Sequence, residues 1–219
     1  ARAESLTEAA GTARLLTLGA DGQGSLTDAS ETQPEAFATV PRAAGDLAAL
    51  LYTSGTTGRS KGAMLTHGNL VSNTRALIEA WEYTARDVLI HALPIFHTHG
   101  LFVATNVTLF SGASMIFQPK FDANRVFEVM PRATVLMGVP TFYTRLLQDD
   151  RLTAGATAGM RLFISGSAPL LAETHREWRA RTGHAHLAED FLGGLDVDVR
   201  LLRHRFEPAH GVPFMTDSC

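Results

Sequence analysis

The sequence has almost no cysteine and no strong excess of either charge. Its single cysteine, Cys219, is the last residue, so no disulfide can form within the chain and a reducing compartment is expected. Lys and Arg number 19 against 22 Asp and Glu, and the net charge of −3 gives no support for binding a nucleic acid. The first residues lack an apolar run of signal-peptide length. We therefore expect a cytoplasmic protein, with the mitochondrial matrix as the alternative if a longer form carries a transit peptide.

One long stretch has no charged side chain. From Val88 to Gln118 there is no Asp, Glu, Lys or Arg, a pattern that superficially fits a membrane span. The stretch contains three histidines, a proline and an asparagine, however, which the core of a bilayer would resist. We predict instead a buried strand, helix and strand, and no membrane span.

Apolar residues make up 45% of the 219 residues, enough for a sizeable core. Their spacing predicts strands at 15–18, 47–52, 61–66, 87–93, 113–117, 134–139 and 162–165. It predicts helices at 67–83, 100–110, 122–131, 140–148 and 170–182. Strands that alternate with helices favour an α/β fold with a largely parallel sheet and flanking helices. We expect residues 1–46 to be the remnant of a preceding subdomain and a connection, 47–185 the core with a loop at 52–62, and 186–219 a poorly ordered tail.

The most informative stretch follows the apolar run that ends at Tyr52. Ser54 to Gly62 holds four hydroxyl residues, three glycines, an arginine and a lysine. Glycines let backbone N–H groups converge on an anion, and Arg59 and Lys61 add positive charge. The general P-loop motif does not fit, because Ser60 stands where a second glycine is required. A merely polar hairpin loop would be shorter.

Ser54 to Gly62 resembles the signature loop of the AMP-forming acyl-CoA synthetases, the acyl-adenylate-forming superfamily. It matches Ser-Gly-(Ser/Thr)-Thr-Gly-x-Pro-Lys-Gly except at Ser60, where proline is usual. The resemblance implies part of the N-terminal domain of the acetyl-CoA synthetase and luciferase-like fold. It also implies ATP, Mg²⁺ and coenzyme A as cofactors, a catalytic role for Lys61, and a loop that cradles the β- and γ-phosphates of ATP. The implied cofactor-binding residues here are Thr53, Ser54, Gly55, Thr56, Thr57, Gly58 and Lys61.

A second motif, Leu93 to Gly100, places two histidines two residues apart between a strand and a helix. No third ligand set follows, so the pattern gives little reason to expect zinc, and we assign no metal ligand. A histidine that only packs in a turn is the plain alternative. In the resembled family this position brings a histidine beside the carboxylate and the α-phosphate, which implies a catalytic and substrate-binding role for His97, with Thr98 as a neighbour. His99 matches no family function.

A third motif, Leu162 to Leu170, follows a buried strand. It lacks the Gly-x-Ser-x-Gly order of a nucleophile elbow. Small residues at the end of such a strand expose backbone groups where open α/β sheets bind ligands. The family has a similar segment that contacts adenine and the acyl group. The resemblance implies that Ser165, Gly166, Ser167 and Ala168 bind the cofactor, and that Ser165 also contacts the substrate.

Taken together, Ile95 to Val103, Met137 to Arg145 and Phe163 to Leu170 resemble the malonyl-CoA synthetase branch of this family. That branch joins malonate to CoA, with ATP giving AMP and pyrophosphate. Malonate carries a second carboxylate, which a dry pocket cannot hold without a cation or several donors. We predict that Arg145 pairs with this carboxylate, the alternative being a solvated arginine on a helix face.

The sequence also lacks parts of the family pattern. The Tyr-Gly-x-Thr-Glu motif that serves adenine, phosphate and Mg²⁺ occurs nowhere in 186–219, and the family's hinge and C-terminal lysine are also missing. We therefore expect an incomplete unit with little or no turnover alone. The alternatives are a synthetase or adenylation domain for another small acid, and a non-catalytic fragment that binds nucleotide weakly.

Overall fold

The computed structural model describes residues 6–7, 10–53, 61–184 and 187–190. The chain divides into two compact units, residues 1–42 and 43–219. The first contains α2 (Ser25–Ser30), none of whose residues is buried. The strand predicted at 15–18 is wrong: this segment is irregular, and the N–H of Thr17 donates to Ser25 Oγ at 2.9 Å. A side chain thus satisfies a backbone group that a strand would pair with another strand.

The second unit begins with an antiparallel hairpin. Strand β1 (Leu47–Thr53) pairs with β2 (Lys61–Thr66) from Leu47 opposite Thr66 to Thr53 opposite Lys61, with a bulge between Leu47 and Ala49. Both strands were predicted within one residue. The loop between them, residues 54–60, lies outside the described residues.

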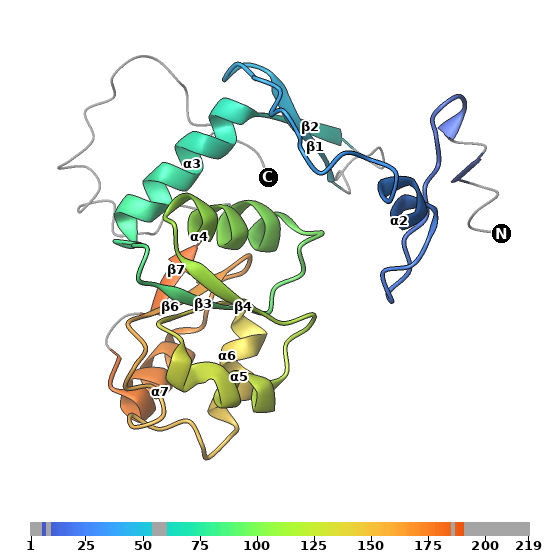
Figure 1. Ribbon diagram of the computed structural model, residues 1–219. Helices are drawn as coiled ribbons and strands as arrows, with labels where there is room; N and C mark the ends of the chain where they lie inside the picture. The colour runs from blue at the N-terminus through green and yellow to red at the C-terminus, as the bar shows by residue number, and fades with distance from the viewer. Residues whose placement is uncertain (1–5, 8–9, 54–60, 185–186, 191–219) are drawn as a thin grey trace. The chain divides into compact units, whose positions relative to one another are not determined.

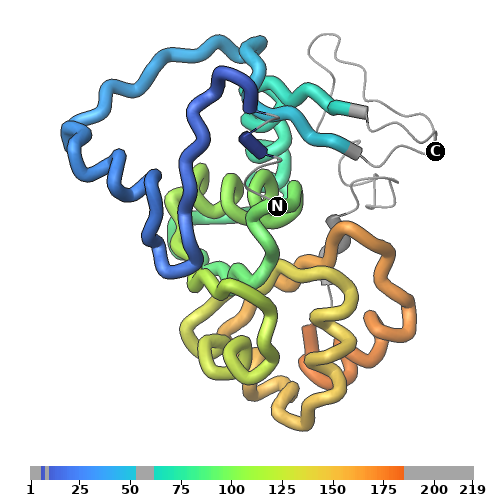
Figure 2. Tube along the Cα trace, turned by 90° about the vertical axis from the view of Figure 1, so that its right-hand side faces the viewer, coloured from blue at the N-terminus to red at the C-terminus, as the bar shows by residue number. Residues whose placement is uncertain are grey.

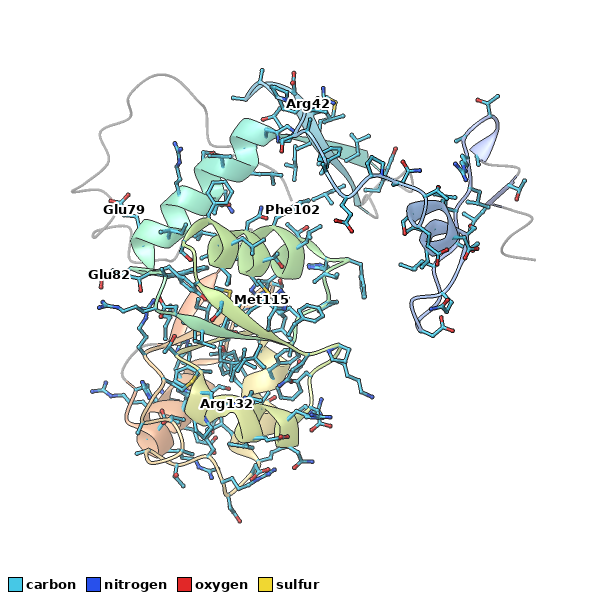
Figure 3. The ribbon with its side chains drawn as sticks, in the orientation of Figure 1. Arg42, Glu79, Glu82, Phe102, Met115 and Arg132 are labelled. Atoms are coloured by element: carbon cyan, nitrogen blue, oxygen red, sulfur yellow. The ribbon has the colours of Figure 1, made fainter. Side chains whose placement is uncertain are left out.

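Helix α3 (His67–Ala80) has well-formed ends. The Asn69 N–H donates to Thr66 Oγ1, and the Thr66 N–H donates to Asn69 Oδ1, a reciprocal N-terminal cap. At the other end the Tyr83 N–H donates to the Ile78 carbonyl at 2.9 Å, which closes the helix with a Schellman turn. The residue inside that turn is Glu82, with φ 49°, where glycine is usual (Figure 3).

Replacement of Glu82 by glycine is expected to stabilise the fold. A left-handed backbone costs a residue with a Cβ about 1–2 kcal/mol, and glycine gives the unfolded chain extra freedom worth about 0.4–1 kcal/mol, so we expect a net gain of about 0.5–1 kcal/mol. Urea denaturation measures it. Ala80→Gly, at a right-handed position in the same helix, is the matched control and should lose stability; a loss in Glu82→Gly as well would contradict the interpretation.

Five parallel strands form the main sheet, in the order β4-β3-β5-β6-β7. The strands are β3 (Val88–His91), β4 (Ser114–Phe117), β5 (Val135–Gly138), β6 (Leu162–Gly166) and β7 (Leu187–Asp190). The helical segments between them are η1 (His99–Thr105), α4 (Asn106–Phe110), α5 (Ala123–Val129), η2 (Met130–Arg132), α6 (Pro140–Leu147) and α7 (Ala172–Thr182). The parallel α/β sheet is confirmed.

Helices cover both faces of this sheet, with α4 on one face and α5, α6 and α7 on the other (Figure 1). The turned view agrees, since the green segment of η1 and α4 is separated from the yellow and orange segment of α6 and α7 (Figure 2). Alternate residues of β3 face opposite sides of the sheet. Ile90 packs in the core beneath α5–α7, and Leu89 packs in the core beneath η1 and α4. Among the described residues, no helix is long and apolar enough to cross a membrane.

The helix predicted at 100–110 is partly wrong in type. Its first half, η1, is a π-helix, and only Asn106–Phe110 is α-helical. A π-helix inserts an extra residue per turn and leaves a carbonyl in need of a partner, and such turns are frequent at functional sites.

Candidate active site

The motifs after β3, β5 and β6 gather at one edge of the sheet. Because the three strands are parallel neighbours, with His91 opposite Met137 and Gly138 opposite Ser165, their carboxyl ends lie together. Ligands of open α/β sheets bind outside this edge. The segments that follow β3, β5 and β6 therefore start from a common border, as expected for one site.

The turn after β3 is tightly folded. The N–H of His97 donates to the Pro94 carbonyl at 3.2 Å. A Cβ on Gly100 would collide with the same carbonyl, so only glycine fits there. His97 is exposed and Thr98 half-buried, while His99 is only 1% exposed. The turn thus leaves His97 accessible to solvent, while His99 beside it is buried.

His91, at the end of β3, anchors the start of the π-helix. Its Nε2 lies 3.0 Å from the Gly100 carbonyl and 3.1 Å from Thr105 Oγ1, which itself donates to that carbonyl at 2.9 Å. Burial lowers the pKa of His91, so the ring is neutral at neutral pH. The Gly100 carbonyl therefore lies within hydrogen-bond distance of a strand residue and of a residue in its own helical segment. No sequence pattern indicated this role for His91.

The turn after β6 is strained at one residue. Ser165 is buried, and Ser167 has φ 67°, a left-handed conformation that is uncommon outside glycine. Ser167 Oγ lies 3.2 Å from His99 Nδ1. The second and third motifs, 68 residues apart, are therefore in direct contact. His99, to which no function was assigned from the sequence, makes that contact.

The environment of His99 keeps its ring neutral. Burial is the main cause, and the neighbouring imidazoles of His97 and His91 add to it, so that the pKa of His99 is lowered to about 4. Its Nε2 is buried and has no hydrogen-bond partner among the described residues. The backbone N–H of His99 donates to His97 Nδ1 at 3.4 Å. His99, itself part of the second motif, therefore contacts His97 within that motif and Ser167 in the third.

Arg145 lies on α6, which follows β5. Its side chain is exposed, and its guanidinium carbon lies 4.8 Å from the centre of the Phe121 ring. Phe121 in turn stacks on Phe142, with ring centres 4.0 Å apart. None of the ion pairs found within the described ranges includes Arg145. The guanidinium is thus held by an aromatic stack, with no acidic side chain paired to it there.

The structure describes only part of the predicted phosphate-binding loop. Thr53 and Lys61 pair opposite each other at the open end of the hairpin, so the loop starts and ends at one place. Ser54, Gly55, Thr56, Thr57 and Gly58 lie outside the described residues. Within the described part of the chain no three His, Cys, Asp or Glu side chains gather to hold a metal ion.

Comparison with known proteins agrees with the α/β architecture. A family model described as AMP-binding enzyme matches residues 2–191. Curated relatives include the mitochondrial malonate–CoA ligase ACSF3 of Mus musculus, 38% identical over 156 residues, and the malonate–CoA ligase of Arabidopsis thaliana, 37% identical over 175 residues. These alignments cover 64% and 71% of this chain but only 27% and 29% of the relatives. Apo MatB from Rhodopseudomonas palustris is 62% identical with a TM-score of 0.81, over 89% of this chain and 38% of MatB.

Proposed function

Since this chain belongs to the AMP-binding enzyme family, we propose that it contributes the nucleotide and acyl site of an AMP-forming ligase that joins malonate to CoA. The chain spans less than a third of the curated relatives' length, so the activity is that of the whole protein. One observation carries the proposal: the turns of His97 and Ser165–Ala168 meet at the carboxyl edge of the sheet, in a chain that is 62% identical to the matching part of MatB.

The proposed reaction has two steps. A malonate oxygen attacks the α-phosphorus of ATP, the bond to the bridging oxygen breaks, and pyrophosphate leaves. The sulfur of CoA then attacks the carbonyl carbon of the malonyl-adenylate, AMP leaves, and the thiol proton passes to solvent. His97 contacts the carboxylate and α-phosphate, and Lys61 stabilises the negative charge that grows on the phosphates.

The remaining predicted residues take binding roles in this proposal. Thr53 and the loop from Ser54 to Gly58 hold the β- and γ-phosphates with hydroxyl and backbone donors. Ser165–Ala168 contact adenine and the acyl group, and Thr98 lies beside the substrate. Mg²⁺ would enter bound to the ATP phosphates, because no three His, Cys, Asp or Glu side chains gather within the described residues.

Malonate-dependent exchange of labelled pyrophosphate into ATP tests the proposal. The assay uses this chain as it stands and, in parallel, R. palustris MatB in which this chain replaces the matching segment. We expect exchange with malonate well above that with acetate, with methylmalonate intermediate. Equal rates with acetate would favour a ligase for another small acid. If neither protein exchanges pyrophosphate while unaltered MatB does, the proposal is overturned. The chain would then be interpreted as a non-catalytic fragment that binds nucleotide.

We propose the cytoplasm as the compartment, with the mitochondrial matrix as the alternative. The single cysteine fits either of these reducing compartments. The mouse relative is described as mitochondrial, which supports the alternative. Fractionation of the source cells with an antibody against this chain separates the two.

A further inference from the structure

We propose that His99 is a positioning residue, whose buried ring and backbone tie the turn that carries His97 to the turn of Ser165–Ala168. This inference rests on the proposed function for its kinetic part only. The contact itself is a property of the fold. His99 touches neither substrate nor nucleotide in this proposal and acts through its two neighbours.

Two contacts made by one residue carry the inference. The ring of His99 reaches Ser167 Oγ through Nδ1 at 3.2 Å, and its backbone N–H reaches His97 Nδ1 at 3.4 Å. Gly100, next along the chain, is held against the Pro94 carbonyl, and its own carbonyl is held by His91. The backbone of His99 is therefore fixed, and a shift of its ring would be passed to Ser167.

The strained backbone of Ser167 explains why such a tie is needed. A non-glycine residue in a sparsely populated conformation costs about 1–3 kcal/mol and persists only where its surroundings hold it there. At Ser167, with φ 67°, the hydrogen bond to His99 is such a restraint. Without it, the turn after β6 is free to relax and to move the backbone groups of Ser165–Ala168.

The chemistry of the buried ring favours this structural use. His99 is 1% exposed and neutral, so it cannot exchange protons readily with solvent or with a substrate. A neutral imidazole can accept from the Ser167 hydroxyl at Nδ1 or donate to it, depending on the tautomer. Its Nε2 has no partner among the described residues, so Nδ1 is the ring atom whose loss matters.

Substitutions that mimic one ring nitrogen or the other test the inference. Asn places a polar atom near the position of Nδ1, Gln near that of Nε2, and Leu neither. In the grafted MatB protein we expect His99→Leu and His99→Gln to lower kcat by about 10- to 100-fold, since a misplacement of about 1 Å can cost that much. We expect His99→Asn to retain most of kcat, and the KM for ATP to change by less than about threefold in all variants.

Two controls separate positioning from general loss of stability. Ser167→Ala removes the other half of the bond, and combined with His99→Leu it should lower kcat no further than either change alone. Asp87→Asn lies at the amino end of β3, away from the motifs, and should lower stability while kcat at 20 °C is retained. Equal kcat losses in the Asn, Gln and Leu variants, or additive losses in the double variant, would overturn the inference.

A measurement on this chain alone keeps the inference testable if the graft is inactive. Amide hydrogen exchange of the 219-residue chain should be faster at residues 163–170 in His99→Leu and His99→Gln than in the unsubstituted chain and in His99→Asn. Unchanged amide protection at residues 163–170 in all three variants would contradict the proposal that His99 restrains this turn. Failure of the proposed function shows instead as an inactive unsubstituted graft, with the exchange pattern intact.

Discussion

Replacement of Arg145 by alanine is expected to raise the malonate concentration needed for half-maximal pyrophosphate exchange by about 10- to 100-fold. A charge-assisted hydrogen bond to a carboxylate is worth about 1.5–3 kcal/mol, and each 1.4 kcal/mol is tenfold in affinity. The requirement for ATP should stay nearly the same, because the guanidinium that is removed is predicted to bind the acid and not the nucleotide. Exchange rates at varied malonate and at varied ATP measure the two requirements.

The aromatic stack suits Arg145 to this task. The guanidinium lies over the Phe121 ring at 4.8 Å, and stacking uses its flat face. Its N–H donors point outward in the same plane and remain able to grip a carboxylate with two parallel hydrogen bonds. The stack of Phe121 on Phe142 also restricts the side chain before the acid binds, which lowers the entropy cost of binding.

Two matched variants sharpen this prediction. Arg145→Lys keeps the charge but loses the two-pronged geometry, so its malonate requirement should fall between those of the parent and of Arg145→Ala. Arg125→Ala removes a similarly exposed arginine, which forms an ion pair with Glu128 at 4.0 Å. This variant should leave both the malonate and the ATP requirement unchanged. A parallel rise in the ATP and malonate requirements of Arg145→Ala would show that the residue serves the fold and not the acid.

Replacement of Asp87 by asparagine is expected to destabilise the second unit by about 2–4 kcal/mol. Breaking a buried ion pair costs about 3–5 kcal/mol, and the 37% exposure of the Arg161 side chain reduces that figure. Asp87, 2% exposed, accepts from Arg161 Nε and Nη2 at 2.7 Å each and from Thr134 Oγ1 at 2.8 Å. These bonds join the amino ends of β3, β5 and β6.

The lowered pKa of the Asp87 carboxyl group also indicates how the stability of the fold depends on pH. Burial alone would raise the pKa of Asp87, but hydrogen bonds from Arg161, Thr84 and Thr134 outweigh it and lower the pKa to about 2. Because the pKa in the folded chain is below its ordinary value of 3.8, this contribution is complete above about pH 5 and is lost as the pH falls toward 2. The stability of Asp87→Asn should lack this part of the acid dependence.

Urea denaturation between pH 3 and pH 7 measures both effects. Glu128→Gln is the control for removal of an acid, since its pair with Arg125 is exposed and worth at most about 0.5 kcal/mol. Equal losses in Asp87→Asn and Glu128→Gln would show that the buried bridge contributes no more than a surface pair.

The sequence by itself determined the features that depend on near neighbours. The helix predicted at 122–131 starts at a residue type that caps helices, and the carboxylate of Asp122 accepts from the N–H groups of Asn124 and Arg125. The helix predicted at 170–182 is followed by Gly183, which ends α7 with φ 75°. The order of strands and helices, and hence the parallel sheet, followed from apolar spacing. These features could be predicted because capping, turn formation and amphipathic patterning act within a few residues of one another.

Only the tertiary structure decided which distant groups meet. Asp87 and Arg161 are 74 residues apart, and His99 and Ser167 are 68 apart; nothing in the local sequence pairs them. His91 likewise reaches, from β3, the Gly100 carbonyl of the π-helix at His99–Thr105. Such contacts form because the parallel strands bring their ends together, and strand order is set by the packing of the whole sheet. The motifs therefore predict that a site exists, while the folded sheet determines which distant residues contact one another to stabilise it.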